Sequence, residues 1–572
     1  MSEFLLTGVT TLDQALDRIV STFPERKALV HGDTEVSYRE LGERIHALAA
    51  GLRRQGLTKG DRVAIILPNC FEFVYAFFAV GKAGGTIVPI NPMLRERELA
   101  HILNDAEVAV AIVAPEVWGN DVVRTLERLR PELPHLRNII VHGDARGADA
   151  LSLAEVIASG AGETVQGIAA PDDIFGLIYT SGTTGTPKGA IHAQPTVLAP
   201  ILAAERLRQT LFERPSLRQM AQLARTMSCS AGRFMRYAGK PQTLLSPSPF
   251  HAMAGYGAVL NAIMFGFRFV IVERFHPVRI LELVEQQRVN VLVGAPTMFA
   301  MMMALPDFDR YDLSSLLYCT MSLAPAPSPL VRQVRQRFGC PVMIAFGATE
   351  ISGPALITRM DDPDEMQVAS VGRATSDATI KIVDEQRREL PPGQVGELAC
   401  RMDSIMLGYY KAPEATAEAT AEAIDADGWY YTGDLATIDE RGYVRIVGRK
   451  KDMIIRGGQN IFPAEIETFL QSHPKIQLAA VVGVPDALSG EAVWAFVLPK
   501  PGLSLSPQEV LDHCRGQVVP YKVPSVVRIV SELPMTATAK VQKFRLREMA
   551  IAELRTQGVA LPEEEFFIGA DQ

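Results

Sequence analysis

Residues 61–113 read DRVAIILPNCFEFVYAFFAVGKAGGTIVPINPMLRERELAHILNDAEVAVAIV, and this stretch decides the fold. Apolar runs at 62–67, 86–90 and 108–113 alternate with helical patterns at 70–82 and 96–105. The order strand, helix, strand, helix, strand predicts a parallel sheet. Because similar runs recur at 269–272, 289–293 and 342–346, we expect α/β layers over most of the first 400 or so residues.

The texture of the sequence changes after Val371. Short runs at 379–383, 396–401 and 443–447, bounded by Gly, Pro and Asp, predict an antiparallel or barrel-like portion. A charged joint, GRKKD at 448–452, then leads into a small α+β unit of about 120 residues. We therefore predict a large α/β domain, 1–448, and a small C-terminal domain, 449–572. The repeat EATAEATAEA at 414–423 predicts a solvated helix.

Composition excludes several classes of protein. The 572 residues carry 57 Lys and Arg against 65 Asp and Glu, a net charge of −8, which argues against nucleic acid as a partner. The six cysteines show no C-x-x-C spacing, and the N-terminus lacks the pattern of a secretory signal, so we expect a reducing, cytoplasmic setting. The apolar stretches fall short of the roughly 20 residues that span a bilayer, so no membrane span is expected.

Residues 174–189, IFGLIYTSGTTGTPKG, form the most informative segment for chemistry. An apolar strand feeds a loop rich in hydroxyls and glycines that ends at a lysine, a composition suited to wrapping a polyphosphate. It is not a Walker loop, because Pro187 and Gly189 flank the lysine. A flexible Gly/Thr turn is the alternative. The candidate nucleotide-binding residues are Thr180, Ser181, Gly182, Thr183, Thr184, Gly185 and Lys188.

Further motifs follow in a fixed order: PFH at 249–251, FGATE at 346–350, the stretch 393–398, YTGD at 431–434, GRKKD at 448–452 and PMTATAK at 534–540. With the loop at 174–189, this set closely resembles the adenylate-forming superfamily, which includes acyl-CoA synthetases, luciferases and carrier-protein adenylation domains. The resemblance spans nearly the whole chain. It implies an enzyme that uses ATP, magnesium and CoA.

The resemblance implies a role for each motif residue around the nucleotide. It places Asp434 on the AMP ribose with Arg449 assisting, although Asp434 alone would be interpreted as an ordinary turn residue. It assigns Glu350 to magnesium, where a helix-start carboxylate is the alternative. The adenine and α-phosphate would contact Phe346, Gly347 and Thr349.

The resemblance assigns Lys540 to catalysis of adenylation, where its ammonium would neutralise charge developing between the acid and the α-phosphate. Ala539 stands where the family has glycine; if the position needs a positive φ, alanine costs roughly 1–2 kcal/mol. Lys451 is the implied hinge, about which the small domain would present Lys540 first and a pantetheine tunnel lined by Gly457 and Gly458 second. A bulge is the other interpretation of these two glycines.

The resemblance places the acid site around His251, Ser322 and Leu323. His251 would border the acyl pocket and swing aside when the thiol enters, whereas a buried core histidine is an equally weighted interpretation. Ser322 and Leu323 stand where relatives often have glycine, so we expect a reshaped acid site. The role of 206–240 is left open.

We therefore predict an AMP-forming acyl-CoA synthetase for a carboxylic acid, most typically a medium- or long-chain fatty acid or a related acyl or aryl acid. Two alternatives stay open: a ligase that loads a carrier protein, and a degenerate nucleotide-binding regulator, the latter motivated by Ala539 and Leu323. A monomer and a homodimer are both compatible with the sequence.

Overall fold

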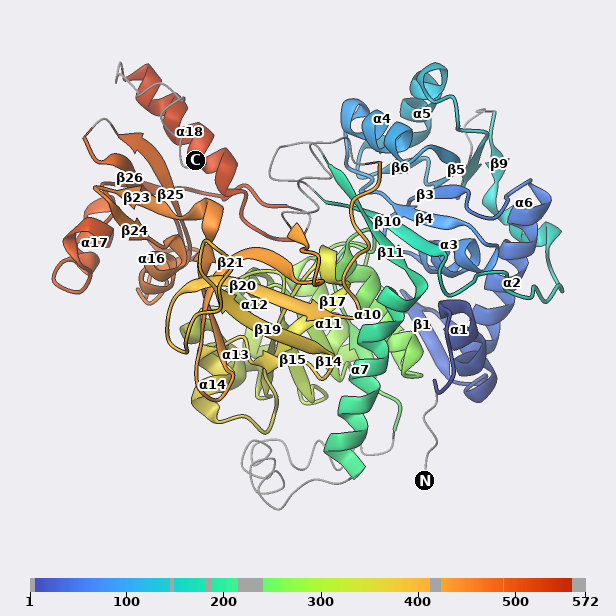
Figure 1. Cartoon of the computed structure of the whole chain (residues 1–572), viewed down its shortest axis with the longest axis horizontal. Helices are drawn as coiled ribbons and strands as arrows, with labels where there is room; N and C mark the ends of the chain where they lie inside the picture. The colour runs from blue at the N-terminus through green and yellow to red at the C-terminus, as the bar shows by residue number, and fades with distance from the viewer. Residues whose placement is uncertain are drawn as a thin grey trace.

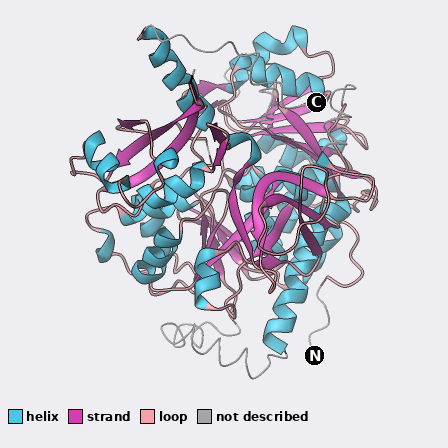
Figure 2. Cartoon of the chain, turned by 60° about the vertical axis from the view of Figure 1, so that its left-hand side comes forward, coloured by secondary structure: helices cyan, strands magenta, loops and turns pink. Residues whose placement is uncertain are grey.

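The computed structural model describes residues 6–144, 149–180, 187–213, 240–411, 423–486, 488–536 and 538–557. A large body is followed by a smaller C-terminal unit that lies to one side of it (Figure 1). Helices and strands are interleaved throughout the chain (Figure 2). Within these described ranges, no helix is long and apolar enough to cross a membrane. The predicted helix at 414–423 lies almost wholly outside the described residues.

The first sheet confirms the pattern at 61–113. β3 pairs in parallel with both β4 and β5, so the apolar runs lie side by side and the helices between them cross over. The strand order is β11(Lys188–Ala193), β10(Ile174–Thr180), β4(Thr86–Pro89), β3(Arg62–Ile66), β5(Val108–Val113), β8(Asn138–Val141), β9(Leu151–Ser152). Helices of this region are α2(Tyr38–Arg54), α3(Phe71–Lys82), α4(Glu96–Asp105), α5(Val122–Leu129), α6(Leu153–Ser159) and η1(Arg130–Glu132), with a small hairpin of β6(Glu116–Val117) and β7(Asn120–Asp121).

The second sheet is also mainly parallel. Its strand order is β18(Arg373–Ala374), β17(Gly353–Ile357), β16(Val342–Ala348), β15(Tyr318–Met321), β14(Val291–Gly294), β12(Thr243–Leu245), β13(Arg268–Val270), β1(Lys27–His31), β2(Thr34–Ser37). The accompanying helices are α1(Leu12–Thr22), α7(Gln194–Glu213), α10(Met253–Met264), α11(Pro277–Gln286), α12(Pro296–Met303), α13(Ser328–Phe338), α14(Asp364–Ala369), η2(Phe308–Arg310) and η3(Thr349–Ile351).

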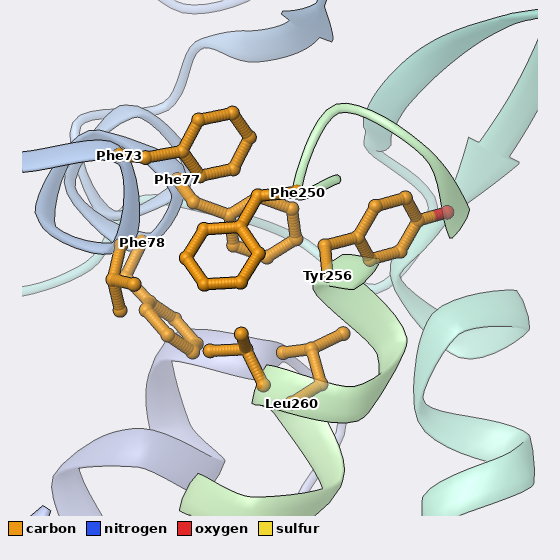
Figure 3. A pocket seen from close by; sticks show the side chains of 8 residues that line it. Phe73, Phe77, Phe78, Phe250, Tyr256 and Leu260 are labelled. Carbon is orange, nitrogen blue, oxygen red and sulfur yellow. The ribbon is translucent and has the colours of Figure 1, made fainter. Parts of the chain in front are cut away.

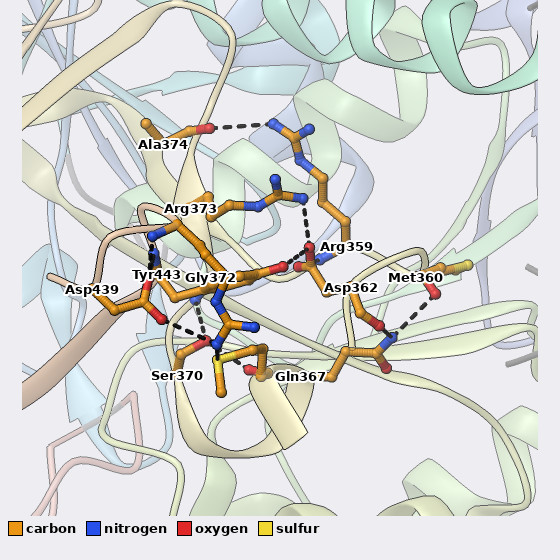
Figure 4. A network of polar contacts seen from close by, with 12 residues as sticks. Arg359, Met360, Asp362, Gln367, Ser370, Gly372, Arg373, Ala374, Asp439 and Tyr443 are labelled. Atoms are coloured by element: carbon orange, nitrogen blue, oxygen red, sulfur yellow. Dashed lines mark hydrogen bonds and ion pairs between the residues drawn. The ribbon is translucent and has the colours of Figure 1, made fainter. Parts of the chain in front are cut away.

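The third sheet is antiparallel, as the short runs after Val371 predicted. Its order is β19(Ala378–Val383), β20(Gly396–Met402), β21(Tyr430–Ile438), β22(Val444–Arg449). A polar network joins it to the second sheet (Figure 4). The carboxylate of Asp362, which is fully buried, accepts from Arg373 at 2.6 Å, Tyr443 at 2.8 Å and the Arg359 backbone at 2.7 Å. These bonds satisfy a charge that would be costly to bury alone.

The C-terminal unit forms its own sheet and hydrophobic core after η4(Lys450–Asp452). The strand order is β24(Gln459–Ile461), β23(Ile454–Arg456), β26(Gly490–Pro499), β25(Ile476–Asp486), with β27(Val526–Ile529) paired to β26. Its helices are α16(Pro463–Leu470), α17(Pro507–Cys514), α18(Lys543–Thr556) and η5(Pro520–Lys522). The predicted fold class, an α/β body with parallel layers and a small α+β unit, is confirmed, and the portion predicted as barrel-like is the four-stranded antiparallel sheet.

Candidate active site

The carboxyl ends of the parallel strands in the second sheet gather several predicted residues along one edge. His251 follows β12, the pair Ser322 and Leu323 follows β15, and Thr349 and Glu350 follow β16. Ser322 donates its backbone N–H to the Gly294 carbonyl at the end of β14, at 3.1 Å, which keeps these strand ends together. In open α/β sheets, ligands bind outside the carboxyl ends of the strands.

The predicted phosphate loop connects the β10–β11 hairpin. Thr180 and Lys188 are the last paired residues of the two strands, so the predicted loop begins after Thr180 and ends before Lys188. Ser181, Gly182, Thr183, Thr184 and Gly185 lie outside the described residues, and so does the side chain of Thr180. The ammonium of Lys188 lies 5.6 Å from the ring centre of Tyr409, within the range of a cation–π contact.

Tyr409 links the first and second sheets, and the sequence analysis missed it. Its segment pairs with β11 through the bridge Ala190 to Tyr409, and its phenol donates to the Glu350 carboxylate at 3.3 Å. Burial, together with the charge of Glu350, raises the pKa of Tyr409, so the phenol stays protonated and can donate. The sequence signal for Tyr409 is the Gly-Tyr-Tyr run at 408–410, which contains neither a charged residue nor a strong nucleophile.

Glu350 is the candidate magnesium ligand. It lies in the 3-10 turn η3 and not at the start of an α-helix, and the bond from Tyr409 reaches Oε1. Within the described part of the chain, no cluster of three or more His, Cys, Asp or Glu side chains that could hold a metal occurs, so Glu350 belongs to a set of at most two such ligands. That fits Mg²⁺, which commonly takes one or two carboxylates and completes its shell with water and substrate phosphates.

Asp434 and Arg449 face each other across the third sheet. The interpretation of Asp434 as a turn residue is wrong: it lies inside β21, paired with Arg449 of β22, whose Nε donates to Oδ1 at 3.1 Å. Gly433, at φ +69°, bends the strand just before it. Burial raises the pKa of Asp434, while the charges of Arg449 and Lys540 oppose that shift. Asp434 keeps Oδ2 outside this pair, so it has an oxygen to offer a ribose hydroxyl.

Lys540 reaches the body from the C-terminal unit. Burial, with the nearby charge of Arg449, lowers the pKa of Lys540, and the carboxylates of Asp434 and Glu350 act in the opposite direction. Lys540 stays exposed to solvent, but the charged groups that act on it, Arg449, Asp434 and Glu350, all belong to the candidate nucleotide site. The structure thus brings together Lys540, Asp434, Arg449 and Glu350, as the motifs implied.

Two residues that replace a family glycine adopt left-handed backbone conformations. Ala539 has φ +59° and Leu323 has φ +77°, whereas this region favours glycine. The position of Ala539 therefore does need a positive φ. Ser322, next to Leu323, is half-buried beside the end of β14.

Among the described residues, no charged group acts on the ring of His251 to hold a proton there. Burial lowers the pKa of His251 to about 4, so the imidazole is neutral at pH 7. The residue before it, Phe250, is fully buried and packs edge-on against Phe73 at 5.5 Å between ring centres. His251 therefore lies two residues before α10, directly after a buried aromatic residue.

A small apolar cavity lies behind this segment (Figure 3). Its aromatic rings come from α3 and from the start of α10, and the phenol of Tyr256 points away from the phenylalanines. It is lined by Phe73, Val74, Phe77, Phe78, Phe250, Tyr256, Val259 and Leu260. No charged group lines it, so the cavity belongs to the packing of α3 against α10 and not to the polar site.

The remaining predicted residues are placed as follows. Gly347 needs to lack a side chain, because a Cβ there would come within 2.4 Å of the Gly353 carbonyl. Phe346 packs against the core of the third sheet. Gly457 and Gly458 form the two-residue turn between β23 and β24, both with positive φ, a requirement of the hairpin and not of a bulge. Lys451 lies exposed in η4, at the joint.

Together, this fold and the order of its motifs define an adenylate-forming enzyme. The chain belongs to the AMP-binding enzyme family: residues 16–410 match the AMP-binding enzyme domain, and residues 465–540 match the AMP-binding enzyme C-terminal domain. It is an enzyme of the AMP-forming acyl-CoA ligase type.

Two relatives are similar over nearly their whole length. The chain is 34% identical over 566 residues to a putative acyl-CoA synthetase, YngI, of Bacillus subtilis, covering 95% of this chain and 97% of that protein. It is 34% identical over 561 residues to the medium-chain fatty-acid–CoA ligase of Escherichia coli, covering 97% and 93%.

Two solved structures share the fold. An anthranilate CoA ligase, AuaEII, in complex with anthranoyl-AMP superposes with a TM-score of 0.82 at 26% identity, covering 95% of this chain and 98% of that one. ATP-bound MatB from Rhodopseudomonas palustris superposes with a TM-score of 0.78 at 26% identity, covering 95% and 99%.

Proposed function

We propose that this chain activates a medium- or long-chain fatty acid, or a related acyl or aryl acid, to its CoA thioester in two steps. The observation that carries the proposal is the convergence of Lys540, from the C-terminal unit, with Asp434, Arg449 and Glu350 of the body. The medium-chain ligase among its relatives supports the acid class.

In the first step, a carboxylate oxygen of the acid attacks the α-phosphorus of ATP, the bond to the β-phosphate oxygen breaks, and acyl-AMP and pyrophosphate form. Asp434 would hold the ribose, Thr349 would contact the α-phosphate, and Phe346 with Gly347 would face the adenine. The ammonium of Lys540 would offset the negative charge that gathers as two anions approach. No protein nucleophile is required, since positioning and electrostatics supply the acceleration.

Magnesium would be held by Glu350 together with the phosphates of ATP. When bound, the ion neutralises charge on the departing pyrophosphate. The Tyr409 phenol, which donates to one oxygen of Glu350, would orient the carboxylate for this task.

In the second step, the C-terminal unit would turn about Lys451 and withdraw Lys540. The CoA thiolate would attack the acyl carbonyl carbon and release AMP, with the thiol arm passing the Gly457–Gly458 turn. His251, Ser322 and Leu323 would border the acyl group. Leu323 places a bulky side chain on a left-handed backbone position, which supports a reshaped acid site. Five described cysteines are free and buried, which supports a reducing cytoplasm as the setting.

The test is pyrophosphate release by the purified protein with acids from acetate to palmitate, and with benzoate and anthranilate, each with and without CoA. We expect release with medium-chain acids and a matching yield of acyl-CoA. Adenylate that forms but never reaches CoA would contradict the proposal and favour carrier-protein loading. Tight ATP binding with no turnover on any acid would favour the regulator. Size-exclusion chromatography with light scattering distinguishes a homodimer from a monomer.

A further inference from the structure

A single hydrogen bond at 2.9 Å connects Thr297 in the body to Ala539 in the C-terminal unit: the threonine Oγ1 donates to the alanine carbonyl, across 242 residues of sequence. Between described residues, an ion pair also spans these parts: the ammonium of Lys450 in η4 lies 3.8 Å from the carboxylate of Glu397 in β20. The hydrogen bond therefore holds the Ala539 backbone against the body, directly before Lys540.

The donor is presented by a rigid element. Thr297 is the second residue of α12, which begins at Pro296 just after β14 ends at Gly294. Its side chain lies against the protein, with the residue only 9% exposed. The hydroxyl thus sits at the same carboxyl edge of the second sheet as Leu323 and Glu350.

The acceptor belongs to a loop that closes on itself. Thr536 donates its N–H to the Lys540 carbonyl at 2.8 Å, and Ala539 donates its N–H to the Thr536 carbonyl at 2.9 Å. The Lys540 N–H in turn donates to the Thr536 hydroxyl at 3.1 Å. Because the Ala539 carbonyl and the Lys540 N–H share one planar peptide unit, a bond to the former fixes the backbone of the latter.

We propose that Thr297 is a positioning residue that docks the Lys540 loop for acyl-AMP formation and releases it before the thioester step. The inference rests on the two-step function proposed above. It assigns to α12 a role in the first half-reaction without any contact between Thr297 and substrate. The bond has to break when the C-terminal unit turns, so it favours one half-reaction and not the other.

The kinetic test compares Thr297→Val, which keeps the shape and removes the donor, with Thr297→Ser, which keeps the hydroxyl. Acyl-AMP formation from octanoate and ATP is measured in single turnover, and thioester formation is measured separately from synthetic octanoyl-AMP and CoA. Loss of one hydrogen bond predicts a roughly five- to tenfold slower first step in Thr297→Val. The thioester step stays at the wild-type rate, and Thr297→Ser behaves like wild type.

An equal loss in both half-reactions, or no loss in either, would overturn the proposal. A second measurement does not depend on catalysis: amide hydrogen exchange of the peptide covering 536–541. We expect faster exchange in Thr297→Val than in wild type or Thr297→Ser, and unchanged exchange would also overturn the docking role. If the wild type turned over none of the acids, the proposed function would fail, while the exchange experiment would still decide whether Thr297 docks the loop.

Discussion

Two joints in the molecule differ in how many polar contacts cross them. The first lies between the second and third sheets, and the second lies between the third sheet and the C-terminal unit. In the first, fully buried Asp362 has three polar partners, and the backbones of Val371 and Gly372 bond Val444 on both sides. In the second, Thr297 supplies one hydrogen bond, and the exposed ammonium of Lys450 lies 3.8 Å from the carboxylate of Glu397. The comparison teaches that one boundary is built to stay closed and the other to open at little cost.

The largest expected effect comes from removing the cation that crosses the second joint. Lys540→Ala should slow acyl-AMP formation roughly 10²- to 10³-fold, because the charge developing in the transition state loses its partner. Thioester formation from octanoyl-AMP should be unchanged. Lys500→Ala is the matched control, since that lysine belongs to the same unit but bonds the Pro474 carbonyl, away from the site. Equal slowing in both variants would contradict the role of Lys540.

The next effect breaks the first joint instead. Asp362→Asn should lower the free energy of unfolding by about 2–3 kcal/mol, because Arg373 and Tyr443 lose a buried anion. Asp364→Asn, whose carboxylate pairs with Arg335 at the surface, should cost less than about 1 kcal/mol. Urea unfolding measures both variants. If Asp362→Asn changed the ratio of the two half-reaction rates but not the free energy of unfolding, this joint would have to move during the reaction.

A pH profile sharpens the comparison further. The pKa of Lys540 is lowered from a lysine's ordinary 10.5 because burial disfavours the charged form. Adenylation needs that charge, so its kcat/KM should fall as pH rises through a value below 10.5. The thioester step, in which Lys540 is withdrawn, should lack this limb. The measurement is kcat/KM of each half-reaction between pH 6 and 10. If both half-reactions lost activity over the same basic pH range, Lys540 would not be withdrawn in the second step.

The smallest effect concerns the strained loop at the second joint. Ala539→Gly removes a left-handed alanine and should stabilise the folded protein by up to about 1 kcal/mol. Ala552→Gly, in the exposed face of α18, should destabilise it by about the same amount, since glycine weakens a helix. Thermal unfolding of the pair gives the sign. Destabilisation in both variants would mean that Ala539 is not strained in solution.

Sequence reasoning predicted the fold well where local pattern and tertiary structure agree. The helix predicted at 70–82 is α3(Phe71–Lys82), and the one predicted at 96–105 is α4(Glu96–Asp105), because apolar periodicity and Gly84–Gly85 mark their ends. The motifs also identified Asp434, Arg449 and Lys540 as candidate site residues from the sequence alone. Whether each performs its implied role stays a prediction.

What the sequence did not predict depends on contacts between distant segments. Neither Thr297 nor Tyr409 belongs to one of the motifs quoted above, and each hydrogen-bonds a partner far along the chain, Ala539 and Glu350 respectively. Asp434 was expected in a turn, because its neighbours Thr432 and Gly433 are turn-forming, yet pairing with β22 draws it into a strand. Pairing across a sheet overrides local propensity here.

The closure of the Thr536–Lys540 loop on itself has one more consequence. These hydrogen bonds hold the Lys540 backbone to Thr536 of the same unit, so Lys540 is carried with the C-terminal unit and its surroundings report the orientation of that unit. Against the body its pKa is lowered; turned outward, it would titrate as an ordinary lysine. An amine-selective reagent should therefore label Lys540 at different rates in the two orientations. Measuring this rate as ATP or acyl-AMP is added would report which fraction of the molecules has Lys540 against the body.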